Sequence, residues 1–189
     1  MIKSKTIRKI FSLILLPALL IQLMVINAAA ADYVITDIAL TPGVSASELN
    51  FAWYTNTETP AGSFVQIAHK SDMENGEFPE NKAETFEGSN TPATAGLASN
   101  KVTVTGLDNS TEYVYRIGDG SDANWSPVYN YTTHDPQNYG FVFVGDPQIG
   151  YKDSNLEKQV WNDTLTKAVE MFPDTGFVLT AGDQVQKNQ

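Results

Sequence analysis

The chain contains no cysteine and only two histidines among its 189 residues. The absence of cysteine excludes a disulfide framework, every thiolate mechanism and every thiolate metal site. Neither His69 nor His134 has a second histidine or a carboxylate at a metal-ligand spacing, so we expect surface or linker positions for both. Stability must therefore come from the burial of a hydrophobic core in domains of ordinary size.

Basic residues are also scarce, with 12 Lys and Arg against 22 Asp and Glu. Four of the basic residues precede an apolar stretch from Ile10 to Ile26, and a run of alanines follows it. This order predicts a secretory signal peptide over residues 1–31, cleaved near Ala30 or Ala31. The apolar stretch of about 17 residues is at the lower limit for a membrane span. We therefore favour cleavage over an uncleaved anchor, and expect a secreted or cell-surface protein without a stable membrane span.

The mature chain becomes more acidic when residues 1–31 are removed. They carry four basic residues and no acidic one, so the formal net charge changes from −10 to −14. An acidic surface repels the phosphate backbone, and we expect no nucleic-acid partner. The default interpretation of this charge is solubility outside a cell.

Residues 32–134 contain short runs of alternating apolar and polar residues, separated by clusters of Thr, Ser, Asn and Gly. This spacing predicts an all-β sandwich of about 100 residues. We expect loops around one short edge strand between residues 71 and 99. The candidate strands are Tyr33–Leu40, Glu48–Tyr54, Phe64–His69, Lys101–Thr105, Glu112–Ile117 and Val128–Thr132.

The most specific pattern in this region runs from Gly106 to Tyr113. A leucine, a turn and then Thr-x-Tyr at the start of a strand are typical of a tyrosine corner, in which the phenol bonds to backbone upstream. We assign Tyr113 this structural role. Trp53, Tyr115 and Trp125 are expected to pack in the core or between domains, and Asp119 to lie in a solvated turn.

After a linker at His134–Asn138 the pattern changes to strand, helix, strand. Phe141–Val144 and Phe177–Thr180 are continuous apolar runs, which predict buried parallel strands. Between them, Ser154 and Glu157 form a capping-box pattern that predicts a helix, which Pro173 ends. The apolar residues at helical spacing are Leu156, Val160, Leu165, Ala168, Val169 and Phe172, with Trp161 beside them.

The chain ends six residues after Asp183. Two parallel strands cannot cover both their faces and both their edges. Residues 135–189 are therefore expected to be the truncated start of a larger α/β domain.

Both predicted parallel strands run into Gly-Asp, at Asp146 and at Asp183. Parallel strands place their carboxyl ends on one edge of the sheet, where open α/β folds bind ligands. Two carboxylates at that edge suit hard divalent cations, and two such ions can share one aspartate. The alternative is that both aspartates merely begin turns, where Gly-Asp is common.

These residues resemble the start of the calcineurin-like metallophosphoesterase superfamily, which has Gly-Asp after a buried strand, then a helix, then Gly-Asp-x-Val. The preceding region resembles the fibronectin-III-like N-terminal domain of purple acid phosphatases. That likeness rests on Val102–Leu107, Thr111–Asp119 and Trp125–Ser126. The resemblance implies a fibronectin-III/Ig-like sandwich followed by the first βαβ unit of a four-layer αββα domain. It also implies hydrolysis of small phosphate esters at a binuclear metal centre, with Asp146 binding the first ion and Asp183 bridging both.

Two positions depart from the family pattern. Gln148 stands where the superfamily has a histidine ligand, and Gln186 where purple acid phosphatases have a tyrosine that binds ferric iron. A neutral amide oxygen is a weaker ligand, which disfavours ferric iron. The implied cofactor is a pair of divalent ions drawn from manganese, zinc, iron, magnesium and calcium. Two interpretations of Gln148 remain: it contacts metal or substrate, or it is a loop residue that faces water.

The sequence thus predicts the N-terminal fragment of an exported metal-dependent, acid phosphatase-like phosphoesterase. The family's remaining ligands and its histidine acid would follow Gln189, so no catalytic residue is expected in the fragment, which should be inactive. The alternative is an extracellular fibronectin-III-like binding or adhesion module with a non-catalytic α/β portion. Gln148 and Gln186 favour this alternative because both weaken a metal site.

Overall fold

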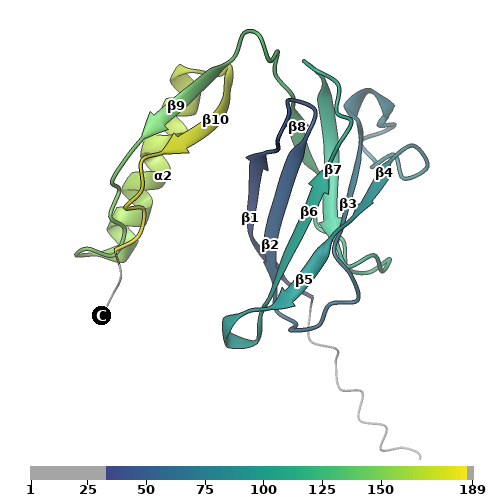
Figure 1. Cartoon of the computed structure of the whole chain (residues 1–189), viewed down its shortest axis with the longest axis horizontal. Coiled ribbons are helices and arrows are strands. Elements are labelled where there is room, and N and C mark those ends of the chain that lie inside the picture. The colour runs from purple at the N-terminus through teal and green to yellow at the C-terminus, as the bar shows by residue number, and fades with distance from the viewer. Residues whose placement is uncertain (1–32, 187–189) are drawn as a thin grey trace, which may run out of the picture. The chain divides into compact units, whose positions relative to one another are not determined.

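The computed structural model describes residues 33–186. Within them the chain forms a β-sandwich and a βαβ unit (Figure 1), and each is described by itself. The predicted signal peptide lies outside the described residues. Within the described residues, none of the helices has the length and apolar composition of a membrane span.

The sandwich consists of two four-stranded antiparallel sheets. The first has the order β1-β2-β6-β5, with strands β1 (Ile35–Pro42), β2 (Leu49–Thr55), β6 (Ala98–Val104) and β5 (Ser89–Pro92). The second has the order β4-β3-β7-β8, with strands β4 (Glu84–Glu87), β3 (Phe64–His69), β7 (Glu112–Gly118) and β8 (Tyr129–Thr132). Two short 3-10 helices, η1 (Lys70–Asp72) and η2 (Thr94–Gly96), lie in the connections. This strand order is that of immunoglobulin-like sandwiches, as predicted.

The core of the sandwich lies between the inward faces of the two sheets. Strand β2 alternates between buried and less buried residues, and Leu49, Phe51 and Trp53 are at most 3% exposed. Residues from β3, β6 and β7 complete the same cluster, including Val65, Val102 and Ile117. Tyr115 packs its ring edge-on against Phe51 at 5.1 Å between centroids, which confirms its predicted packing role.

The tyrosine corner is confirmed. The backbone N–H of Asp108 donates to the Tyr113 hydroxyl at 2.8 Å. Tyr113 is 4% exposed, and the His69 ring lies against it at 4.9 Å. The hydrogen bond between Asp108 and Tyr113 fixes the turn that leads into β7.

Residues 71–99 differ from the prediction of one short edge strand. The chain forms two strands there, β4 in the second sheet and β5 in the first, with Gly88 between them. A Cβ on Gly88 would lie 1.9 Å from the Lys101 carbonyl oxygen, so only glycine fits where the chain crosses between sheets.

Asp119 also differs from its predicted solvated turn, because it is only 7% exposed. Its carboxylate accepts hydrogen bonds from the Ser121 amide at 2.9 Å and from the Asn124 side chain at 2.8 Å. Burial tends to raise the pKa of Asp119, but these donors outweigh it and leave the pKa lowered. Asp119 is thus a buried turn anchor.

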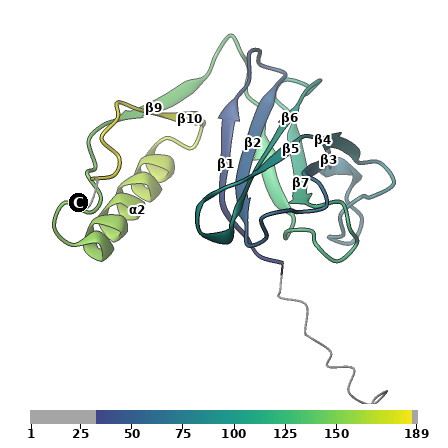
Figure 2. The same ribbon diagram turned by 60° about the horizontal axis from the view of Figure 1, so that its bottom comes forward.

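The βαβ unit contains β9 (Gly140–Val144), α2 (Ser154–Met171) and β10 (Thr175–Thr180). The two strands pair in parallel, with Val142 opposite Val178 and Val144 opposite Thr180. Figure 2 shows α2 running alongside the two strands. The predicted strand–helix–strand order is therefore confirmed.

The start of α2 corrects the predicted capping box. Asp153, not Ser154, is the N-cap, and its carboxylate accepts from the amides of Asn155 at 3.0 Å and Leu156 at 3.1 Å. Asp153 can accept both bonds because its charged side chain reaches the free amides of the first turn. Glu157 then falls one position too late for a capping box.

The predicted burial of the parallel strands is wrong for the described residues. Phe141 is 51% and Phe143 64% exposed, because one helix covers one face of a two-stranded sheet. Among the apolar residues of α2, Trp161, Leu165 and Ala168 are half-buried. The other apolar helix positions, Leu156, Val160, Val169 and Phe172, are at least half exposed.

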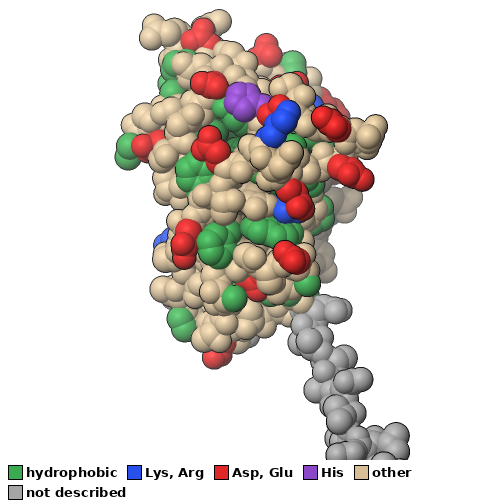
Figure 3. All heavy atoms as spheres, turned by 90° about the vertical axis from the view of Figure 1, so that its right-hand side faces the viewer, with side chains coloured by type: hydrophobic (Ala, Val, Ile, Leu, Met, Phe, Trp, Pro, Cys, Tyr) green, Lys and Arg blue, Asp and Glu red, His purple; other side chains and the backbone are tan. Residues whose placement is uncertain are grey.

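Surface charge follows the acidic composition. On the face of the molecule in Figure 3, acidic side chains are scattered among a few basic ones.

Arg116 packs its charged group against two aromatic rings. Its guanidinium lies 4.6 Å from the Phe78 ring and 4.7 Å from the Trp125 ring. Trp125 thus packs within the sandwich, in line with its predicted structural role.

We expect Tyr113→Phe to lower the free energy of unfolding of the sandwich by about 1–2 kcal/mol, since it leaves the Asp108 amide without its acceptor. Urea denaturation at neutral pH measures this. Tyr54→Phe is the control, because Tyr54 lies on the outward face of β2 and is 38% exposed. Equal losses for the two variants would contradict the role of the corner.

Candidate functional site

The segments that follow β9 and β10 stay hydrogen-bonded to each other beyond the ends of the strands. The Asp146 amide donates to the Gly182 carbonyl at 3.3 Å, and the Gln148 amide to the Asp183 carbonyl at 2.9 Å. Ile149 continues the pairing by donating to Gln184 at 3.1 Å and accepting from Gln186 at 2.9 Å. We call these paired segments, residues 145–149 and 181–186, the Gly-Asp edge. All four predicted site residues lie on it.

Three of these four residues have left-handed backbone. The φ angles are 58° at Asp146, 43° at Gln148 and 47° at Asp183. For residues other than glycine, left-handed backbone costs roughly 1–2 kcal/mol per residue, and Asp and Asn tolerate it best. Such strained positions cluster at functional sites, where the surrounding structure holds them.

The two glycines of the Gly-Asp edge serve its backbone in different ways. Gly182 has a φ of 99°, which glycine adopts without strain. A Cβ on Gly145 would lie 3.2 Å from the Ala181 Cβ, a tight contact between the two paired segments. Both glycines therefore serve the backbone geometry that places the aspartates.

The side chains at the Gly-Asp edge are accessible oxygen donors. Asp146, Asp183 and Gln186 are exposed and Gln148 is half-buried. Carboxylate and amide oxygens suit hard divalent cations, which take six or more ligands. Among residues 33–186 no group of three His, Cys, Asp or Glu could hold a metal ion. The four side chains offer oxygen donors on one edge, but within residues 33–186 they do not form a complete metal site.

Sequence reasoning missed one contact of the loop that carries two of the site residues. This β9–α2 loop, residues 145–153, is bonded to Glu157 of α2 through the amides of Gly150 at 2.6 Å and Lys152 at 2.9 Å. The Ser-x-x-Glu pattern drew attention to Glu157, but only as a capping residue. The sequence feature that could have indicated this contact is a glutamate one turn into a helix that follows a glycine-containing loop.

His69 lies in the sandwich, as predicted. Its Nε2 is 3.6 Å from an Asp108 carboxylate oxygen, and its side chain is 47% exposed. His134 follows β8 in the linker and is half-buried. Neither histidine belongs to the Gly-Asp edge.

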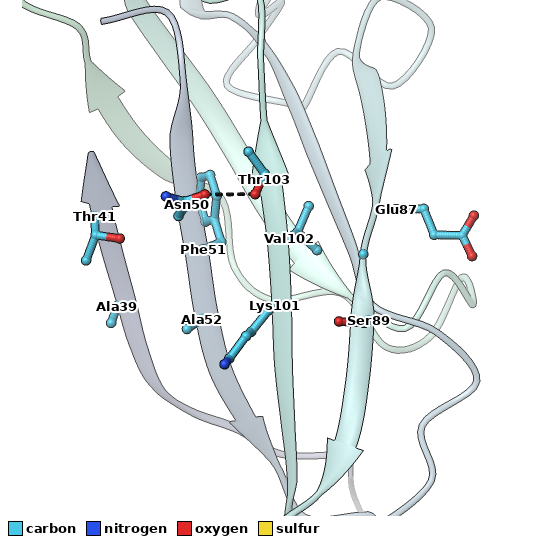
Figure 4. A pocket seen from close by; sticks show the side chains of 11 residues that line it. Ala39, Thr41, Asn50, Phe51, Ala52, Glu87, Ser89, Lys101, Val102 and Thr103 are labelled. Atoms are coloured by element: carbon cyan, nitrogen blue, oxygen red, sulfur yellow. Dashed lines mark hydrogen bonds between the residues drawn. The ribbon is translucent and has the colours of Figure 1, made fainter. Parts of the chain in front are cut away.

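The sandwich carries a separate shallow hollow of about 610 Å³ on the outward face of its first sheet. Figure 4 shows that β1, β2, β6 and β5 line it, mainly with small and polar side chains. The Thr103 hydroxyl donates at 2.8 Å to Oδ1 of Asn50, its register partner on β2, so these two polar groups already satisfy each other. The hollow contains no residue of the Gly-Asp edge.

Comparison with known families identifies the sandwich. The model of the purple acid phosphatase N-terminal domain matches residues 35–133, more than half of the chain. The chain belongs to the purple acid phosphatase N-terminal domain family. The resemblance noted in the sequence is confirmed for this part of the chain. No curated protein matches the chain.

Similar solved structures share little sequence identity with this chain. A purple acid phosphatase from yellow lupin (Lupinus luteus) seeds is 14% identical, with a TM-score of 0.49, over 79% of this chain and 35% of that chain. The fn3 domain of human collagen alpha-1(XX) is 15% identical, with a TM-score of 0.35, over 60% of this chain and 95% of that chain. The chain thus spans about a third of the length of the lupin enzyme.

We expect Gln148→Gly to leave the βαβ unit as stable as the parent or more stable, because glycine removes the cost of left-handed backbone. Gln186→Gly, on the same edge but outside that backbone region, should lower stability by about 0.5–1 kcal/mol. Denaturation followed at amide signals of β9 and β10 measures both. Equal destabilisation would show that Gln148 bears no strain.

Proposed function

We propose that the chain is the amino-terminal part of an exported, metal-dependent phosphoesterase of the purple acid phosphatase type. The hydrogen-bonded Gly-Asp edge carries the proposal, because it holds Asp146 and Asp183 side by side at the carboxyl ends of two parallel strands. Membership of the N-terminal domain family supports it from the other half of the chain. The expected substrates are small phosphate esters.

Each residue of the edge has a proposed part. Asp146 would hold the first divalent ion and Asp183 would be shared by both ions, while the amide oxygens of Gln148 and Gln186 would offer weaker contacts. A bound pair of divalent ions stabilises the negative charge that develops during phosphoester hydrolysis. The ions come from the set of manganese, zinc, iron, magnesium and calcium, and the further ligands and the general acid from sequence that follows Gln189.

The open face of the strands supports a larger α/β domain. Alternation places Phe141 and Phe143 on the same face of β9, and both are more than half exposed. Their register partners on β10 are Phe177 and Leu179, and the Phe141 and Phe177 rings stack at 5.2 Å. The less exposed Val142 and Val144 occupy the other face. A helix on one face and an apolar opposite face suit a four-layer αββα arrangement, in which a second sheet packs on the phenylalanines.

The alternative of a binding or adhesion module is favoured in the sequence by Gln148 and Gln186, and in the structure its candidate site is the hollow of the first sheet. The hollow is shallow, its lining mixes small apolar side chains with polar and charged ones, and two of its polar groups bond to each other. Apolar walls with a few convergent polar groups are typical of ligand pockets. The hollow therefore supports the alternative less well than the Gly-Asp edge supports a metal site.

Metal binding can be tested on this chain with paramagnetic Mn²⁺, which broadens the amide signals of nearby residues. We expect the first broadening within residues 145–149 and 181–186, and its loss in Asp146→Asn and Asp183→Asn. Asparagine tolerates left-handed backbone, so these variants keep the fold of the edge. Asp163→Asn on the exposed part of α2 is the matched control. Broadening spread evenly over the acidic surface would contradict the site.

Hydrolysis is expected only when the rest of the domain is present. The 189-residue chain should not turn over p-nitrophenyl phosphate with added manganese, zinc or iron, because its described residues offer too few ligands. In a protein that continues through the domain, Asp183→Asn should reduce kcat/KM by at least about 100-fold, as the ions supply several kcal/mol. Turnover by the chain alone, or unchanged activity of the variant, would refute this account.

A further inference from the structure

The β9–α2 loop is attached at two sides. Toward β10, its residues Gln148 and Ile149 bond to the backbone of Asp183 and Gln184. Toward the helix, the Gly150 amide donates to Glu157 Oε2 at 2.6 Å and the Lys152 amide to Glu157 Oε1 at 2.9 Å. Both carboxylate oxygens of Glu157 are thus occupied by amides of this loop.

The position of Glu157 is fixed by the helix. Glu157 lies four residues before Trp161, on the half-buried side of α2 that continues through Leu165 and Ala168. The backbone amide of Glu157 also donates to the N-cap carbonyl of Asp153 at 2.9 Å. The loop is therefore bonded to a helix that runs alongside the two strands (Figure 2).

The loop needs these hydrogen bonds because several of its residues have left-handed backbone conformations. Asp146 and Gln148 have left-handed φ angles, and Gly150 has a φ of 96°. Partial burial tends to raise the pKa of Glu157, but the amide donors of the loop outweigh it and leave the pKa lowered. Glu157 therefore stays ionised and keeps both acceptors at neutral pH.

We propose that Glu157 is a positioning residue for the metal site: by accepting the Gly150 and Lys152 amides, it holds the loop that presents Asp146 and Gln148 to the ion. The inference rests on the proposed function, and deepens it. We assign Glu157 no ligand role, because both of its carboxylate oxygens face amides of the loop. Residues that orient metal ligands typically contribute 10–100-fold in metal affinity.

The test compares Glu157→Gln with Glu170→Gln, an exposed glutamate near the other end of the same helix. Glutamine keeps the shape but replaces one acceptor oxygen with an NH₂ donor, which cannot accept an amide N–H. In Glu157→Gln we expect faster hydrogen exchange at the Gly150 and Lys152 amides and about tenfold weaker Mn²⁺ binding at the Gly-Asp edge. Glu170→Gln should change neither.

The outcomes separate the two proposals. A purely structural role for Glu157 would lower the denaturation midpoint but leave the Mn²⁺ affinity of the folded chain unchanged, and that result would overturn the positioning role alone. Unchanged exchange at Gly150 and Lys152 would overturn it as well. If the parent chain binds no Mn²⁺ at the Gly-Asp edge, the proposed function fails, and the positioning role fails with it.

Discussion

The candidate site depends on the backbone pairing that continues past the ends of β9 and β10. Without the bonds from Asp146 to Gly182 and from Gln148 to Asp183, the two connections would be free to diverge where the strands stop. These bonds join main-chain groups, so they set the distance between the segments whatever side chains they carry. Left-handed backbone lets the segments turn while they remain paired. The parallel strands bring both segments to the same edge of the sheet, and the backbone pairing beyond the strands keeps the segments that carry the two aspartates close together.

The sandwich could be predicted where the cause was local. Alternation in β2 fixed which side of that strand is inward, and Thr-x-Tyr identified the corner at Tyr113. The crossing at Gly88 could not be predicted, since the reason for glycine is the carbonyl of Lys101 on another strand. The same holds for Asn100, an inward and fully buried residue of β6 whose Oδ1 accepts from the Ser63 hydroxyl at 2.7 Å.

At the Gly-Asp edge the sequence could predict which residues meet but not how they are held. Two parallel strands that end in Gly-Asp were enough to bring Asp146 and Asp183 to one edge. The role of Glu157 could not be predicted, because a side chain that reaches back to loop amides resembles a helix cap in sequence. The exposure of Phe141 differed from the prediction for another reason. A continuous apolar run shows that a strand is suited to burial, whereas burial itself depends on what packs against it.

The left-handed backbone also bears on the choice between a metal site and a pair of turns. Asp and Asn tolerate this conformation because their short side chains can bond locally, so a turn alone would explain Asp146 and Asp183. That explanation does not extend to Gln148, whose longer side chain has no such local advantage at a φ of 43°. Glycine or asparagine would suit that backbone better. Gln148 stands where the superfamily has a histidine, and of the three left-handed residues it is the one least suited to its backbone conformation. A turn alone gives no reason for glutamine at this backbone conformation, and the proposed contact of its amide oxygen with the ion, although weaker than that of a histidine, would give one.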